Sequence, residues 1–168
     1  MKLLTPIQFI ALDAAHDRSI FNSGSEPLDR YFKQQVTQDI RRKVANCFVA
    51  LTDENRIAGY YTLSAMSFLL ADLPQDQAKK LPRYPVVPAV RMGRLAVDQD
   101  FKGQGLGGAL LADALARCLR SDIAAYALVV DAKDQQAVSF YQHHGLLAFA
   151  DKPMTLFLPL ATARFLVK

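Results

Sequence analysis

Residues 90–119 read VRMGRLAVDQDFKGQGLGGALLADALARCL, and this stretch decides the fold. Val90–Val97 is rich in apolar residues and predicts a β-strand, and residues 98–104 form a polar connection that contains glycine. Residues 106–119 repeat apolar side chains at helical spacing and predict a long amphipathic helix. Its expected buried face consists of Leu106, Leu110, Leu111, Ala114, Leu115 and Cys118.

The residues that follow predict a second strand, a second helix and a last strand. Ala125–Val130 (AYALVV) is almost wholly apolar, as expected of a strand buried on both faces. A helix is expected from about Gln135 to His144, because Asp134 suits its N-cap and Gly145 its end. Thr155–Leu160 predicts the last strand, and its proline places it near an edge or an end.

Upstream of the decisive stretch, the pattern predicts helices and then a hairpin. The first forty residues are expected to be mainly helical, with a turn at residues 22–25. Cys47–Leu51 and Ile57–Ser64 flank a polar turn and predict an antiparallel hairpin. Four prolines in residues 72–89 predict a loop with one short helix at Gln75–Leu81. The order predicts a mixed α/β (α+β) fold in which an antiparallel hairpin leads into a central βαβ unit.

Length and composition limit the class of protein. The chain has 168 residues, 51% of them hydrophobic and 21% charged, which predicts one globular domain over residues 1–168 and excludes disordered and collagen-like chains. No apolar run approaches the roughly 18 residues of a membrane span, so a soluble, cytoplasmic protein is expected. Cys47 and Cys118 show no metal-ligand spacing, so we expect buried thiols and no metal site.

The glycine-rich turn carries the chemistry. Four glycines, Gly103, Gly105, Gly107 and Gly108, precede or open the long helix, where free backbone N–H groups and the helix dipole favour phosphate oxygens. The spacing also satisfies G-x-G-x-x-G, the dinucleotide fingerprint. That fingerprint needs the glycines directly after a strand, whereas residues 98–102 intervene here. A P-loop is excluded too, because no Lys-Ser/Thr pair follows the glycines.

Two motifs resemble signatures of the GNAT acyltransferases. Residues 94–98 followed by Lys102-Gly103-Gln104-Gly105-Leu106-Gly107 are similar to the family's acetyl-CoA signature, with Lys102 where Arg or Gln is usual. The pattern from Asp134 to Gly145 resembles the second signature, in which Asn is common at the position of Asp134.

The resemblance implies the GNAT fold, acetyl-CoA as acetyl donor and an N-acetyltransferase activity. It places the general acid at Tyr141, whose phenol holds its proton at pH 7. It further implies that backbone N–H groups of Leu95, Ala96 and Val97 meet the thioester and pantetheine. The implied acetyl-CoA residues are Leu95, Ala96, Val97, Lys102, Gly103, Gln104, Gly105, Leu106, Gly107, Gly108 and Asp134.

The match is closer to the GNAT toxins of bacterial toxin–antitoxin pairs. It rests on residues 21–24 (FNSG) with 28–29 (LD), 59–64 (GYYTLS), 83–85 (RYP) and 93–98 (GRLAVD). This branch implies acetylation of the α-amino group of aminoacyl-tRNA, a ribbon-helix-helix antitoxin and a homodimer. No general base stands out, which is compatible with an α-amine, because its pKa lies near 7.7–8.0. Two alternatives stay open: a GNAT enzyme acting on a small amine or a protein amino group, and a non-catalytic module that binds acyl-CoA or RNA.

A net charge of +4 favours an anionic partner, and the basic residues are unevenly placed. The predicted RNA contacts form two clusters: Arg41, Arg42 and Lys43, and the run Lys79, Lys80, Arg83, Arg91 and Arg94, which contains no acidic residue. Tyr60, Tyr61 and Tyr84 are candidates for stacking on bases, with packing in the core as the alternative. His143 and His144 are expected to stabilise the end of their helix.

Overall fold

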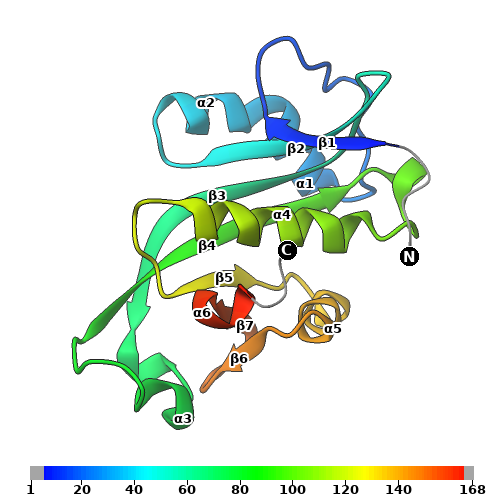
Figure 1. Ribbon diagram of the computed structural model, residues 1–168. Helices are drawn as coiled ribbons and strands as arrows, with labels where there is room; N and C mark the ends of the chain where they lie inside the picture. The colour runs from blue at the N-terminus through cyan, green and yellow to red at the C-terminus, as the bar shows by residue number, and fades with distance from the viewer. Residues whose placement is uncertain (1–5, 165–168) are drawn as a thin grey trace. The chain divides into compact units, whose positions relative to one another are not determined.

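The computed structural model describes residues 6–164 (Figure 1). These residues form two compact units. The first unit holds the described residues up to Ser64 together with Gly93–Ala114, and the second holds Ala65–Met92 and the described residues from Leu115 onward. In chain order the elements are β1 (Ile7–Ala11), α1 (Glu26–Arg30), the π-helical η1 (Tyr31–Gln35), α2 (Val36–Arg41), β2 (Asn46–Thr52), β3 (Ile57–Leu69), the 3₁₀ turn η2 (Leu70–Asp72), α3 (Gln75–Ala78), β4 (Val86–Val97), the 3₁₀ turn η3 (Gln99–Phe101), α4 (Leu106–Arg120), β5 (Ala127–Asp131), α5 (Gln135–His143), β6 (Leu147–Phe149), β7 (Lys152–Pro159) and α6 (Leu160–Ala163).

The strands of the described chain follow the hydrogen-bonded order β1-β2-β3-β4-β5-β7-β6. Strands β2 and β3 form the predicted antiparallel hairpin, and β4 pairs with β5 in parallel through the crossover helix α4. The predicted mixed α/β fold, with a hairpin leading into a βαβ unit, is therefore confirmed. The prediction of one domain over residues 1–168 stays a prediction.

In the first unit, helices and sheet enclose an aromatic core. The Phe32 ring stacks on Tyr60 with centroids 4.2 Å apart, and Phe21 meets Phe32 edge-on at 5.0 Å. Phe32 is supplied by η1 and Tyr60 by β3, so this cluster holds the helical segment against the sheet, with α2 alongside β2 (Figure 1). Phe21 lies in the loop before α1, and its burial fixes that loop as well.

In the second unit, β5 is enclosed on both faces. Ala127, Leu128, Val129 and Val130 have no measurable exposure, which confirms the predicted doubly buried strand. Strand β5 pairs antiparallel with β7, and β7 pairs with β6. The core of this unit packs Phe149 against Phe68 and Phe157, at ring distances of 5.0 and 5.1 Å.

The prediction for the N-terminal region was wrong in part. Residues Ile7–Ala11 form a strand, not a helix, because their backbone groups pair with β2, for example Phe9 opposite Ala50. The local alternation of Ile7, Gln8 and Phe9 has the period of a strand. The helical segment begins at Glu26, and its predicted apolar residues Tyr31, Phe32 and Val36 are buried.

The other boundaries differ from the predictions by a few residues. Strand β4 begins at Val86 instead of Val90, and β7 begins at Lys152 instead of Thr155. The short strand β6 was not predicted, because three residues carry too little pattern. Both cysteines are buried free thiols, and burial raises the pKa of Cys47 to about 12. Across residues 6–164, every helix is too short or too polar to cross a membrane.

Candidate functional site

The turn before α4 depends on two glycines in the left-handed conformation. Gly103 has φ +80° and Gly105 has φ +81°, a region that L side chains rarely adopt. A Cβ at Gly103 would meet nothing within 4 Å. The positive φ of Gly103 is thus the reason for glycine at this position. The space beside the turn is open.

The start of α4 presents backbone N–H groups. The Ala109 N–H donates to the Gly105 carbonyl at 3.1 Å. The N–H groups of Leu106, Gly107 and Gly108 precede this bond, so the helix offers them no carbonyl acceptor. Gly107 and Gly108 add no side chains in front of them, and the helix dipole favours an anion at this end. The turn thus has the geometry that a phosphate group needs.

Gln104 adds a polar group to this turn. It is half-buried, and its side-chain Oε1 is fully buried without a hydrogen-bond partner among the described residues. A buried amide oxygen without a partner is costly, so it marks a place for an additional donor. The residues of the turn therefore fit the pyrophosphate and amide groups of an acyl-CoA.

The loop that leads from β4 to the turn is organised by Asp98, which was not identified from the sequence. Its carboxylate is buried and accepts the N–H of Asp100 at 2.9 Å and the N–H of Asn22 at 2.9 Å. The Arg56 guanidinium donates to the same carboxylate at 3.1 Å. A buried charge needs partners of this kind, and here they hold the loop in place.

Lys102 also reaches across to the loop before α1. Its Nζ donates to the Ser23 carbonyl at 2.7 Å, and the Gln99 N–H donates to the Asn22 carbonyl at 2.8 Å. The side chain of Lys102 therefore connects two loops of the first unit. A contact between Lys102 and a phosphate stays a prediction.

The predicted pantetheine strand is the last part of β4. Ala96 is buried, whereas Leu95 and Val97 are half-buried. Within the described chain, β4 pairs with β5 only over Ala89–Met92, so the backbone of residues 95–97 lies beyond that pairing. The predicted contact with pantetheine requires backbone N–H groups that are not paired with β5.

Tyr141 lies on α5 in the second unit and is buried, with 7% of its surface exposed. Burial raises the pKa of its phenol to about 12. Its hydroxyl makes no hydrogen bond to another residue in 6–164. Asp134 begins the same helix as N-cap, because its carboxylate accepts the Ala137 N–H at 2.8 Å, as predicted. His143 is exposed and His144 half-buried, and both lie at the C-terminal end of α5, as expected.

The basic residues of the two clusters differ in exposure and in their partners within the chain. The exposed members are Arg41, Arg42, Lys43, Lys79, Lys80 and Arg83. Arg91, by contrast, forms an ion pair with Asp131, and the Arg94 guanidinium lies 3.5 Å from the centroid of the Tyr31 ring. These two arginines have partners inside the chain, and their contact with RNA stays a prediction.

The tyrosines divide between core and surface. Tyr60 and Tyr61 are completely buried, so the hypothesis that they stack on bases is wrong. Tyr60 packs on Phe32 and donates its hydroxyl to the Leu28 carbonyl at 2.7 Å. Tyr84 is 71% exposed and stays a candidate for stacking.

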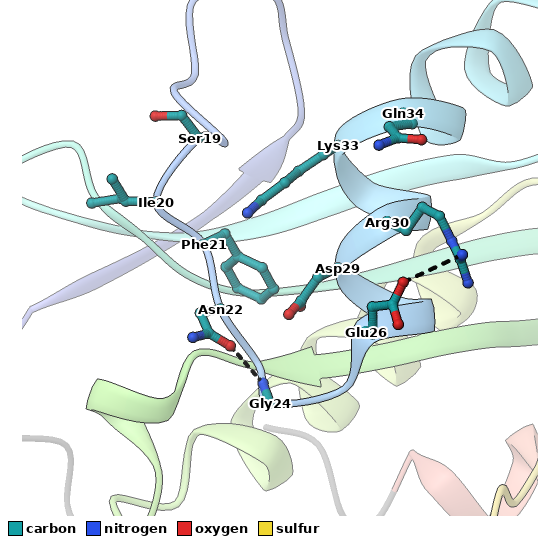
Figure 2. Close-up of a pocket in the computed structure, with 10 residues that line it drawn as sticks. All are labelled: Ser19, Ile20, Phe21, Asn22, Gly24, Glu26, Asp29, Arg30, Lys33 and Gln34. Carbon is teal, nitrogen blue, oxygen red and sulfur yellow. Dashed lines mark hydrogen bonds and ion pairs between the residues drawn. The ribbon is translucent and has the colours of Figure 1, made fainter.

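A pocket that sequence reasoning missed lies in the first unit (Figure 2). Its volume is about 640 Å³, within the range of roughly 300–1,000 Å³ of small-molecule sites. Its lining overlaps the motif at residues 21–24 and 28–29, but that motif does not indicate a pocket, because a loop and a helix face form it together. It is lined by Ser19, Ile20, Phe21, Asn22, Gly24, Glu26, Asp29, Arg30, Lys33 and Gln34. Among residues 6–164, no group of three or more His, Cys, Asp or Glu side chains is placed to hold a metal ion.

Comparison with known proteins gives similar relatives over almost the whole chain. The chain is 34% identical over 155 residues to a Mycobacterium tuberculosis protein named tRNA-acetylating toxin, covering 91% of this chain and 92% of that protein. It is similar to AtaT solved with acetyl-methionyl-tRNAfMet, with a TM-score of 0.84, 30% identity and coverage of 96% and 99%. A Tyr-to-Phe mutant of the AtaT toxin, bound to acetyl-CoA and the C-terminus of the antitoxin AtaR, gives a TM-score of 0.77, 25% identity and coverage of 95% and 97%.

The family model described as the acetyltransferase (GNAT) family matches residues 11–146. That range includes β4, the glycine turn, α4 and Tyr141. The chain therefore belongs to the GNAT acetyltransferase family.

Proposed function

We propose that this acetyltransferase moves the acetyl group of acetyl-CoA to the α-amino group of aminoacyl-tRNA and so blocks translation as a toxin. The observation that carries the proposal is the similarity to a tRNA-acetylating toxin over nine-tenths of both chains. The complex of AtaT with acetyl-methionyl-tRNAfMet supports the same acceptor.

The donor side of the proposed site consists mainly of backbone groups. The N–H groups at Leu106, Gly107 and Gly108 bind the pyrophosphate, with the helix dipole behind them. The buried amide oxygen of Gln104 lies in the same turn as the left-handed Gly103 and Gly105. The backbone of residues 95–97 aligns the pantetheine and the thioester carbonyl, and Asp134 fixes the start of α5. Lys102 contributes a positive charge beside the turn.

Tyr141 is the proposed general acid. Acetyl-CoA supplies an acetyl thioester, from which an amine takes the acetyl group while the sulfur leaves with the bonding electrons. Tyr141 holds a proton at its phenol oxygen and donates it to that sulfur. Its raised pKa of about 12 keeps the phenol protonated at neutral pH. An α-amino group is partly neutral near pH 7, so the neutral amine attacks the thioester carbonyl, and its nitrogen releases a proton to water once the N–C bond has formed.

The acceptor side of the proposal uses the exposed basic residues. We assign the contacts with tRNA phosphates to exposed cations: Arg41, Arg42 and Lys43 at the end of α2, and Lys79, Lys80 and Arg83 after α3. We also propose that the half-buried Arg91 and Arg94 contact the tRNA while they keep their interactions with Asp131 and Tyr31. We include a ribbon-helix-helix antitoxin, a homodimer and a cytoplasmic location in the proposal, and the AtaT complex with the antitoxin AtaR supports an antitoxin partner.

The test offers radiolabelled acetyl-CoA with charged tRNA, uncharged tRNA, lysine peptides and polyamines in parallel. We expect label to enter charged tRNA and to be released as an N-acetyl amino acid after mild base. Label in peptides or polyamines in preference to charged tRNA would contradict the proposed acceptor and favour another amine. Absence of transfer to every amine, with acetyl-CoA still bound, would favour a binding module.

A further inference from the structure

Two acidic and two basic side chains line the pocket of Figure 2, and one of the basic ones has no bonding partner among the described residues. Of its charged lining residues, Arg30 pairs with Glu26 at 3.4 Å. The Asp29 carboxylate accepts both the N–H and the hydroxyl of Ser23, at 3.0 and 2.7 Å. Lys33 is exposed and makes no hydrogen bond or ion pair with another residue in 6–164.

The uncharged part of the lining supplies a donor and an apolar wall. The Asn22 Oδ1 accepts the Gly24 N–H at 2.9 Å, which leaves the amide NH₂ of Asn22 as an available donor. Ile20 is 62% exposed at the pocket, beside the buried Phe21. Figure 2 shows Lys33 reaching toward this Ile20–Phe21 segment. An ammonium and an amide donor beside an exposed aliphatic side chain suit an anion that is attached to a less polar group.

The pocket wall is bonded directly to the loop that carries the glycine turn. The Asn22 N–H donates to Asp98, and the Asn22 carbonyl accepts the Gln99 N–H at 2.8 Å. The Lys102 ammonium then holds the Ser23 carbonyl at 2.7 Å. Pocket wall and glycine turn thus belong to one hydrogen-bonded part of the first unit. An anion in the pocket would lie at a fixed position relative to the phosphates of the acetyl donor.

We infer that this pocket binds a phosphodiester in the single-stranded 3′ end of the acceptor RNA, with Lys33 as its cation. The inference rests on the proposed function, because that function supplies an acceptor with such an end. The volume of about 640 Å³ suits a nucleotide-sized group, whereas a duplex is recognised over a broad surface. Lys33 is thus proposed as a residue that binds the acceptor close to the reacting amine.

The test compares Lys33→Gln and Lys33→Arg with the parent protein. The matched control is Lys152→Gln, which removes the same charge from an exposed ion pair with Asp72 in the second unit. Three acceptors carry the same amino acid: full tRNA, a short 3′-terminal oligonucleotide with its phosphodiesters, and aminoacyl-adenosine without any. Initial rates give kcat and KM for each acceptor and KM for acetyl-CoA.

We expect Lys33→Gln to raise KM for the tRNA and the oligonucleotide about tenfold, with kcat and the KM for acetyl-CoA unchanged. The KM for aminoacyl-adenosine should not change, and Lys33→Arg should restore most of the affinity. Equal effects on all three acceptors, or an effect no larger than that of Lys152→Gln, would overturn the inference. If the parent protein acetylates none of the three acceptors, the proposed function itself fails, which is a separate result.

Discussion

At the scale of the residue, Tyr141 combines a polar group with an apolar environment. Its ring is buried beside Phe140, and its phenol has no hydrogen-bond partner among the described residues. A buried phenol keeps its proton more firmly than an exposed one, because the phenolate is poorly solvated. These properties keep the phenol protonated at neutral pH.

Replacing Tyr141 by Phe removes the hydroxyl and keeps the ring. We expect kcat to fall by about 10²–10⁴, the usual contribution of a general acid, while KM for acetyl-CoA changes little. Tyr126→Phe is the matched control, because Tyr126 is a half-buried tyrosine of the same unit whose hydroxyl donates to Gln77. Steady-state kinetics on both variants decide the matter. Unchanged kcat in Tyr141→Phe would remove the tyrosine from the mechanism.

The pH dependence of the rate follows from the same group. Activity should rise as the acceptor amine loses its proton near pH 7.7–8.0. Because Tyr141 acts in its protonated form and its pKa is raised to about 12, the rate should then stay level through pH 10. An unperturbed phenol would instead lose its proton near pH 10. Initial rates with an amide-linked acceptor, which resists hydrolysis, test this, and a decline centred at pH 10 or below would contradict it.

At the scale of the element, β3 and α4 approach each other closely at Gly59. A Cβ at this position would lie 2.8 Å from the Leu110 side chain and 2.9 Å from the Ala96 carbonyl. Neither neighbour yields easily, because Leu110 is fully buried and Ala96 contributes backbone. This glycine therefore sets how closely the helix that begins at the donor turn lies to the strand.

Gly59→Ala should consequently reduce the free energy of unfolding by about 1–3 kcal/mol, the typical cost of overpacking. It should also raise KM for acetyl-CoA, because α4 and its first turn must shift. Gly93→Ala serves as control, since a Cβ there meets only the Thr62 hydroxyl, at 3.4 Å. Urea denaturation followed by circular dichroism measures the difference. Equal stability of the two variants would show that the approach of helix and strand tolerates a methyl group.

Elements with a strong period were predictable, and those that depend on distant partners were not. Helix α4 has an apolar face of six residues and was predicted to within one residue of its end, and β5 was identified by its unbroken apolar run. Strand β1 is short and mixed, and its hydrogen bonds come from β2, some forty residues away in sequence. The π-helical turn at Tyr31–Gln35 has no signature of its own, since its apolar spacing resembles that of an α-helix.

The candidate site divides in the same way. The glycine turn was predictable because glycine suits its backbone, and Tyr141 was proposed from its position in a motif. The pocket at Lys33 forms where the loop of residues 19–24 folds against α1 and η1. The contacts of Asp98 and Lys102 join segments about seventy to eighty residues apart, such as Asn22 with Asp98. Local sequence contains no information about such contacts. The two basic arginines with internal partners, Arg91 and Arg94, were indistinguishable from exposed cations for the same reason.

At the scale of the whole molecule, a net charge of +4 is small, and its placement matters more than its size. Each basic cluster has three exposed members, Arg41 to Lys43 and Lys79 to Arg83, in different compact units. If tRNA is the acceptor, binding should release counterions, and log KM for tRNA should rise linearly with log salt. KM for acetyl-CoA should depend on salt less steeply, because backbone groups supply most of its contacts.

Neutralising one cluster at a time tests which of them meets the tRNA. Two triple variants each replace one cluster by glutamine: Arg41→Gln/Arg42→Gln/Lys43→Gln and Lys79→Gln/Lys80→Gln/Arg83→Gln. We expect each to lower the slope of log KM for tRNA against log salt by about 0.7–0.9 for every phosphate that the cluster neutralises in the parent protein. Arg91 and Arg94 are left intact, because replacing them would break their interactions with Asp131 and Tyr31. Lys152→Gln, which removes one positive charge outside both clusters, should leave the slope unchanged. A slope that neither triple variant alters would exclude both clusters from the interface, whereas a change in one alone would assign the tRNA to that unit.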